Sequence, residues 1–193
     1  MDPLSQIMLL VLGTVFSVAL LLLWLRFLMQ LADVDYYSPF SQFIAKVTTP
    51  LVKPFQSILP TIGRADLAPI ALIFIIKLLQ IGIMAQLANQ AFTPGLLVVN
   101  AVFALLLNAT TFFFWLILGT VILSWVSAAS GGVNPALVPL FEIAEIVLAP
   151  CRRIMPAMGG FDLSPIVAFL GIQIIEILIK SAYPSAIGLL AGA

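Results

Sequence analysis

Four long apolar segments constrain this chain more than any other feature of its sequence. Each reaches or approaches the roughly 20 residues that a helix needs to cross a hydrocarbon core about 30 Å thick. They are residues 7–30, 70–87, 96–126 and 166–183. The chain is 63% hydrophobic and 8% charged, whereas soluble domains carry roughly 25% charged residues. We therefore predict an all-α membrane protein with about four transmembrane helices.

The third segment is longer than one crossing requires. Residues 96–126 carry no charge, and as one helix they would extend roughly 46 Å. The segment must therefore tilt, project beyond the bilayer or begin as an interfacial stretch. Asn100 and Asn108 lie in its first half, which favours a crossing in the second half. The short connection 88–95, with Thr93, Pro94 and Gly95 as turn signals, predicts an antiparallel hairpin of segments two and three.

The two halves of the chain repeat one another at a constant offset of 96 residues. The matching pairs are Pro39 and Pro135, Pro54 and Pro150, Pro60 and Pro156, Gly63 and Gly159, Asp66 and Asp162, Leu67 and Leu163, and Pro69 and Pro165. Each unit contains two crossings, so both copies insert in the same direction. We predict two tandem, parallel helix-loop-helix repeats, residues 1–92 and 93–193.

Each long loop of the repeat contains an amphipathic stretch. In the first loop, one helical face carries Phe40, Phe43, Ile44, Val47 and Leu51. In the second loop, one face of the equivalent stretch carries Leu137, Leu140, Phe141, Ala144 and Leu148. Two interpretations stay open. The helices lie flat in the interface, or they are re-entrant, with the first dip bounded by Pro50 and Pro54.

Basic residues predict how the chain is oriented. The long loops contain Lys46, Lys53, Arg64, Arg152 and Arg153, whereas both tails and the central turn have no Lys or Arg. By the positive-inside rule, the loops face the cytoplasm and the termini face outward. Trp24 and Trp125, near the loop-side ends of segments one and three, agree with an aromatic belt.

Three of the loop cations are candidates for binding anionic lipid or a protein partner. They are Lys53, Arg152 and Arg153. The alternative is that these residues only set the topology.

A shared motif precedes the last helix of each repeat. It consists of Gly63, Asp66 and Pro69 in the first repeat and of Gly159, Asp162 and Pro165 in the second. Gly permits a turn with positive φ, Asp caps free N–H groups, and an early Pro forfeits only an unpaired donor. Helix-start punctuation explains the motif fully. The alternative is that Asp66 and Asp162 also hold a partner or an ion.

Ionisable residues inside a span are costly, so Lys77, Glu176 and Lys180 are candidates for an intramembrane polar site. Glu176 falls near mid-membrane, where it must be neutral, paired or facing water. Lys180, four residues later, is its obvious partner, and Lys77 is the alternative. A structural pair and a solute or proton pathway are both compatible with this pattern.

The sequence has no His and a single Cys, Cys151. It therefore lacks the commonest general base and metal ligand. The net charge is zero, so no global field attracts nucleic acid. We predict no enzymatic activity, no cofactor, no metal site and no nucleic-acid partner. The expected partner is the lipid bilayer, joined by anionic lipids, another membrane protein or a second copy in a homo-oligomer.

The sequence resembles the bacterial YggT family, also called YlmG-type, over nearly its whole length. The first half matches through Arg26-Phe-Leu-Met-Gln30, Pro39-Phe-Ser-Gln-Phe-Ile44, Lys46-Val-Thr48 and Pro50. The second half matches through Pro150-Cys-Arg-Arg-Ile-Met-Pro156, Ala157-Met-Gly-Gly160 and Asp162-Leu-Ser-Pro165. The first half lacks a basic pair at Phe55-Gln56-Ser57, so only Arg152 and Arg153 can inherit the role of that pair.

The resemblance implies a protein of the bacterial inner membrane and transfers no catalytic residues. Its members are linked to osmotic-stress tolerance, to organisation near the division machinery and, in plastids, to assembly of a b-type cytochrome. We therefore expect a non-enzymatic membrane scaffold or assembly factor. The alternative is a small ion or solute pathway lined by Lys77, Glu176 and Lys180.

Overall fold

The computed structural model describes residues 3–87, 93–154 and 162–182. Its elements in chain order are α1 (Pro3–Leu31), α2 (Pro39–Gln56), β1 (Thr61–Ile62), β2 (Ala65–Asp66), α3 (Leu67–Leu87), α4 (Pro94–Ser130), the 3-10 helix η1 (Pro135–Leu137), α5 (Val138–Ile154) and α6 (Ser164–Ala182). Four helices, α1, α3, α4 and α6, are long and apolar enough to cross a membrane. The predicted all-α membrane fold is confirmed, with one short hairpin of two two-residue strands added within the described ranges.

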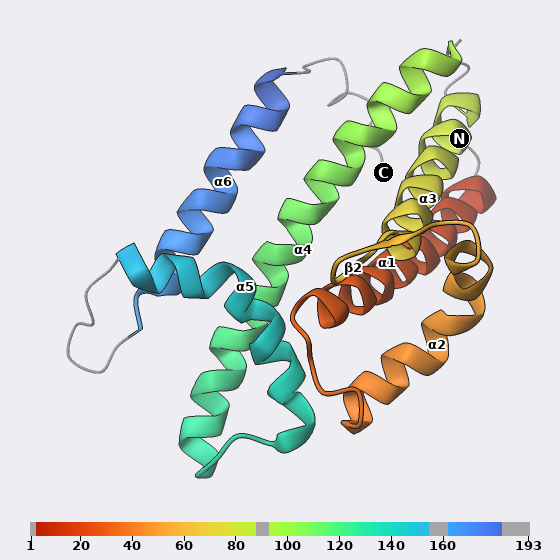
Figure 1. Cartoon of the computed structure of the whole chain (residues 1–193). Helices are drawn as coiled ribbons and strands as arrows, with labels where there is room; N and C mark the ends of the chain where they lie inside the picture. Colours follow the sequence, from red (N-terminus) through yellow and green to blue (C-terminus); the bar gives the residue numbers. More distant parts are fainter. Residues whose placement is uncertain (1–2, 88–92, 155–161, 183–193) are drawn as a thin grey trace.

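The four long helices pack in an order that follows the repeat. α1 packs against α3, α3 against α4, and α4 against α6. Figure 1 shows α4 between α3 and α6, with α2 and α5 lying across the end where α3 and α6 begin. Each repeat therefore has two spans and one transverse loop helix. The boundary between 92 and 93 falls beside residues outside the described ranges, so it stays a prediction.

The third apolar segment forms part of one continuous helix, α4. Its last turns continue past α5 (Figure 1) and expose Trp125 and Val126. How this length is accommodated in the bilayer, by tilt, by projection or by an interfacial start, stays a prediction. Asn100, in the half that the sequence placed outside the crossing, is 1% exposed. It stands beside Ala101, which packs with Ile81 of α3, so both halves of α4 contribute to the core.

The two repeats are joined by a polar contact inside the core. The indole Nε1–H of Trp24 in α1 donates to Oδ1 of Asn108 in α4 at 2.8 Å. The Trp24 ring also stacks on Phe112, with centroids 5.8 Å apart. A buried indole N–H requires an acceptor, and Asn108 supplies it. The prediction that Trp24 belongs to an interfacial belt is therefore wrong, because this side chain is 5% exposed.

We expect the hydrogen bond between Trp24 and Asn108 to couple the repeats by roughly 0.6 kcal/mol, with about 1.7 kcal/mol as the upper range for such bonds in membrane proteins. A double-mutant cycle with Trp24→Phe and Asn108→Leu, followed by unfolding in detergent, measures this coupling. Trp115→Phe is the control, because Trp115 is 62% exposed and its replacement should change stability little. Strictly additive effects of the two core substitutions would contradict the coupling.

Candidate functional site

The first repeat turns back toward the bilayer through Asp66. Its Oδ1 accepts a hydrogen bond from the N–H of Ala68 at 3.0 Å, which caps the start of α3. Its Oδ2 accepts a hydrogen bond from Nε2 of Gln56, at the end of α2. Asp66 is 1% exposed, and Gly63 adopts φ +61° in the turn between β1 and β2. The structure thus gives Gly63 and Asp66 the predicted local roles. It adds a hydrogen bond from Gln56 that joins the end of α2 to Asp66.

Asp162 of the second repeat makes the same two kinds of contact as Asp66, with a different donor. Oδ1 of Asp162 accepts from the N–H of Ser164 at 2.9 Å, at the start of α6. Its Oδ2 accepts from Nε of Arg152 at 3.0 Å and from Nη2 at 2.8 Å. Arg152 stands 96 residues after Gln56, so the contact between Arg152 and Asp162 is equivalent to the contact between Gln56 and Asp66. Gly159 lies outside the described residues.

The two motif prolines take early helical positions, as predicted. Pro69 is the third residue of α3 and Pro165 the second residue of α6. The first turn of a helix has no internal acceptor for its N–H groups, so a missing N–H costs nothing there. The motif is therefore consistent with helix-start chemistry in both repeats.

Arg152 is held between two carboxylates and is not a free cation. Besides Asp162 it contacts Oε1 of Glu145. Burial alone would raise the pKa of Asp162, but the hydrogen bonds from Ser164 and Arg152 and the charge of Arg152 hold it below its usual value. Burial opposes the charge of Arg152 too, yet Glu145 and Asp162 raise the pKa of its guanidinium. Arg152 therefore joins α5 to the start of α6 within its own repeat, and its binding of anionic lipid or a partner stays a prediction.

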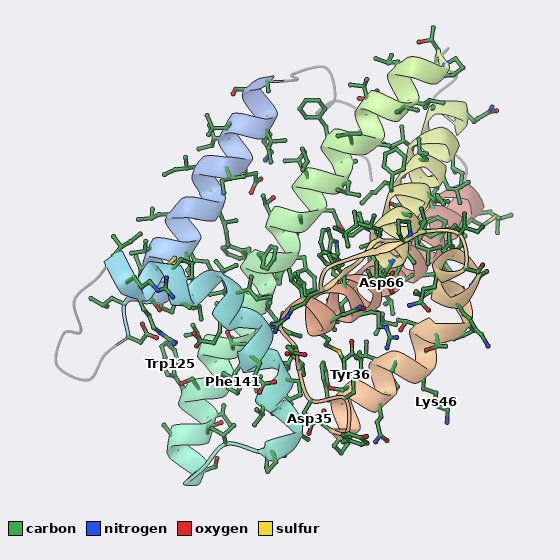
Figure 2. All side chains as sticks on the ribbon, in the orientation of Figure 1. Asp35, Tyr36, Lys46, Asp66, Trp125 and Phe141 are labelled. Carbon is green, nitrogen blue, oxygen red and sulfur yellow. The ribbon has the colours of Figure 1, made fainter. Side chains whose placement is uncertain are left out.

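The other two loop candidates remain accessible. Lys53 in α2 and Arg153 in α5 are exposed, and neither forms an ion pair within the described part of the chain. Lys46 is also exposed on α2 (Figure 2). These side chains can meet anionic headgroups or an acidic partner surface.

The loop helix α2 has three distinct faces. The face against the protein carries the buried residues Ser41, Ile44, Thr48 and Val52. An apolar face is exposed and carries Phe43, Val47 and Leu51. The third face is polar and exposed, with Gln42, Lys46, Thr49 and Lys53.

The predicted apolar face of α2 is therefore largely the exposed one. Of its five residues, Ile44 alone is buried. The hydroxyl of Thr48 bonds the carbonyl of Ile44 at 2.6 Å, so this side chain enters the core with its hydrogen bond satisfied. The helix continues through Pro50 and Pro54 and lies across the ends of the spans (Figure 1). Whether α2 lies flat in the interface or dips into the membrane stays a prediction.

The intramembrane candidates divide into a pair and a separate lysine. Glu176 and Lys180 form a salt bridge along α6, with their side chains 33% and 45% exposed. Lys77 belongs to α3, and α4 lies between α3 and α6 (Figure 1). Lys77 has no hydrogen bond or ion pair within the described ranges. The structure thus pairs Glu176 with Lys180 and does not bring Lys77 into the same site.

Sequence reasoning gave no separate role to Arg26, near the end of α1. Its guanidinium lies over the ring of Tyr36, with Cζ 5.6 Å from the centroid, as in a cation–π contact. Its Nε is buried without a partner among the described residues. Burial and the charges of Asp66 and Asp33 raise the pKa of Tyr36, although Arg26 opposes this shift. Tyr36 and Asp66 both lie near the loop-side end of α1 (Figure 2). The sequence feature that could have identified Arg26 is a charged residue in the last two turns of an otherwise apolar helix.

The part of the chain that the structure describes contains no candidate metal-binding site. No group of three or more Asp, Glu or Cys side chains gathers there in a way that could hold an ion. The open groove between α1 and α3 is lined mostly by apolar residues, among them Met8, Leu12, Leu78 and Ile83. Neither feature offers a reaction centre. The predicted absence of a cofactor and of activity stays a prediction.

We expect the charge of Asp162 to stabilise the fold only above its own pKa. Because folding lowers this pKa, the stabilisation is present above the unfolded value of about 3.9 and is lost as pH falls through the folded value. Asp162→Asn keeps a capping side chain but removes the charge. Its unfolding temperature should lie below that of the parent at pH 7, and the difference should shrink as pH falls below about 3.9 and vanish below the lowered pKa of the folded state. A difference that is independent of pH would contradict the ion pair, and Asp35→Asn is a control at an exposed carboxylate.

Comparison with known proteins gives a consistent result. The family model described as CCB3/YggT matches residues 5–87 and again residues 99–183. An uncharacterized protein of Pseudomonas aeruginosa is 38% identical over 88% of this chain and 86% of its own length. The uncharacterized protein YggT of Escherichia coli K12 is 35% identical over 86% and 85%, respectively. No solved structure matches. The two matched segments support the tandem repeat, and the chain belongs to the CCB3/YggT family of multi-pass membrane proteins.

Proposed function

We propose that this protein is a non-enzymatic scaffold or assembly factor of the bacterial inner membrane. Its working surface is the layer formed by α2 and α5, which faces the cytoplasm while both termini face outward. The observation that supports this most directly is the exposed polar face of α2, with Lys46 and Lys53 free of ion pairs among the described residues. A basic surface on a fixed helix suits anionic lipid headgroups or an acidic protein segment.

The turns at Asp66 and Asp162 make this layer suitable for a scaffold. Each loop helix is tied at its end to the start of a span, by Gln56 in α2 and by Arg152 in α5. A surface that is fixed relative to the membrane can position a partner without ordering itself first, which reduces the entropic cost of binding. A role in organising a membrane complex, or in tolerance of osmotic stress, is consistent with such a platform.

The two loop helices present opposite charges at equivalent positions. Lys46 of α2 corresponds to Glu142 of α5, and both are exposed. At this position the layer is thus basic on the first repeat and acidic on the second, while Arg153 supplies an exposed cation at the end of α5. Complementary charges chiefly set the specificity and rate of association, so a partner with two oppositely charged segments would bind in one register.

An ion or solute pathway has less support from the contacts. A pathway requires polar side chains to converge on a space that water can enter. Glu176 is neutralised by Lys180 on its own helix, and Lys77 lies on α3, with α4 between it and that pair (Figure 1). The groove between α1 and α3 is apolar. Unchanged flux through reconstituted protein carrying Glu176→Gln would remove the remaining case for that residue.

We expect photoreactive amino acids at positions 46 and 53 to capture the same partner protein in living cells. Both positions are on the polar face of α2, so one bound partner can reach both. The measurement is the mass of the crosslinked product and the identity of the captured chain. The matched control is position 175, which is 52% exposed on the span α6. A lack of any defined product at 46 and 53, or the same product at 175, would count against the scaffold.

The orientation has its own test. In a Cys151→Ala background, Tyr37→Cys places a thiol at a site that is 87% exposed in the loop layer. An impermeant thiol reagent should leave it unlabelled in intact cells and label it in opened vesicles, because the positive-inside rule assigns this side to the cytoplasm. Thr93→Cys, exposed at the other end of the spans, should show the opposite pattern. Labelling of position 37 from outside would reverse the topology.

A further inference from the structure

One of the contacts between the two repeats joins α3 to α4. In the first repeat the contacting face belongs to α3 and carries Phe74, Leu78 and Ile81. In the second repeat it belongs to α4 and carries Leu97, Ala101 and Ala104. Small residues on α4 let the large side chains of α3 approach closely, which is a common way to pack helices in a membrane. The last span of one repeat thus meets the first span of the next.

The face of α6 that is equivalent to this face of α3 is exposed. At an offset of 96, Phe74, Leu78 and Ile81 correspond to Leu170, Ile174 and Ile177 of α6. These three residues are 56%, 58% and 64% exposed. The other face of α6, with Ala168 and Ile172, is buried. The outer face of α6 is therefore an unused copy of an interface that the chain forms within itself.

The complementary face is open at the other end of the chain. Asn100 and Ala104 of α4 are 1% and 2% exposed, whereas the equivalent Leu4 and Met8 of α1 are 70% and 58% exposed. Both halves of the contact between repeats are thus present on the outside of the molecule.

The loop layer shows the same relation. Ile143 of α5 is 0% exposed, and α1 of the first repeat is among the helices that contact α5. The equivalent residue of α2, Val47, is 39% exposed. Met29 near the end of α1 is 0% exposed, whereas the equivalent Trp125 of α4 is 70% exposed. In the loop layer, too, each of these exposed residues is equivalent to a buried residue of the other repeat.

We propose that a second copy of this chain docks head to tail, so that α6 of one copy packs against α1 of the next as α3 packs against α4 within the chain. The same step brings the end of α4, with Trp125, toward the exposed apolar face of α2. Such contacts use different surfaces on the two copies, and they form a ring or an open array according to the rotation between copies. This inference is independent of the proposed scaffold role.

The ion pair of α6 favours a protein neighbour over lipid. Lys180 follows Ile177 by three residues, so it borders the open face. Its side chain is 45% exposed and that of Glu176 is 33% exposed. Charged groups in a span are costly when lipid surrounds them. A helix packed on Leu170, Ile174 and Ile177 would exclude acyl chains from one side of this pair.

Disulfide trapping in native membranes tests this docking. Two differently tagged chains in a Cys151→Ala background are coexpressed, one with Ile177→Cys and the other with Met8→Cys. These positions match Ile81 and Ala104, which belong to one cluster within the chain. Mild oxidation should link the two different tags into one dimer. The sites are 64% and 58% exposed, so the substitutions should not prevent folding.

The matched control pairs Ile175→Cys with Leu10→Cys. Both residues are exposed, at 52% and 72%, and so are their equivalents Leu79 and Leu106, at 53% and 41%. The repeats do not use this face for mutual contact, so the control should give only background dimer. Two outcomes would overturn the proposal. One is a dimer of Ile177→Cys with itself at equal yield, which indicates a face-to-face contact. The other is a yield for the test pair no higher than the control, which leaves the face to lipid.

Discussion

The carboxylates of Asp66 and Asp162 fix how each repeat returns from the loop layer to the bilayer. The first N–H groups of a helix have no internal acceptor, and in the hydrocarbon region water cannot provide one. Each Asp caps a helix start with one oxygen and binds the end of the preceding loop helix with the other. A single side chain therefore determines the start of a span and the position of a transverse helix.

The two repeats solve this problem with different charges. Asp66 is 1% exposed and accepts from the neutral amide of Gln56. The side chain of Asp162 is 46% exposed and pairs with Arg152, which a second carboxylate, Glu145, also holds. An ion pair tolerates exposure better than burial, because burial removes the hydration of both charges. The presence of Gln instead of Arg in the first repeat thus matches the greater burial of Asp66.

The sequence was sufficient for features that depend on local composition and spacing. The four spans, the repeat offset and the caps at Asp66 and Asp162 all follow from short stretches of chain. It was insufficient for the choice between lipid-facing and protein-facing surfaces. In a bilayer an exposed apolar side chain carries no penalty, so apolarity does not identify the packed face. This is why Phe43 is exposed on α2 while Thr48 is buried.

The sequence also did not predict contacts between residues that are far apart in the chain. Trp24 bonds a residue 84 positions later, and Arg152 is bound by carboxylates at 145 and 162. The same limit applied to Glu176, for which the spacing offered both Lys180 and Lys77. The structure selects Lys180 on the same helix. A pair closed within one helix carries no net charge, so the helix can insert as a unit. The pair is still polar, so a protein neighbour on the outer side of α6 is less costly than lipid.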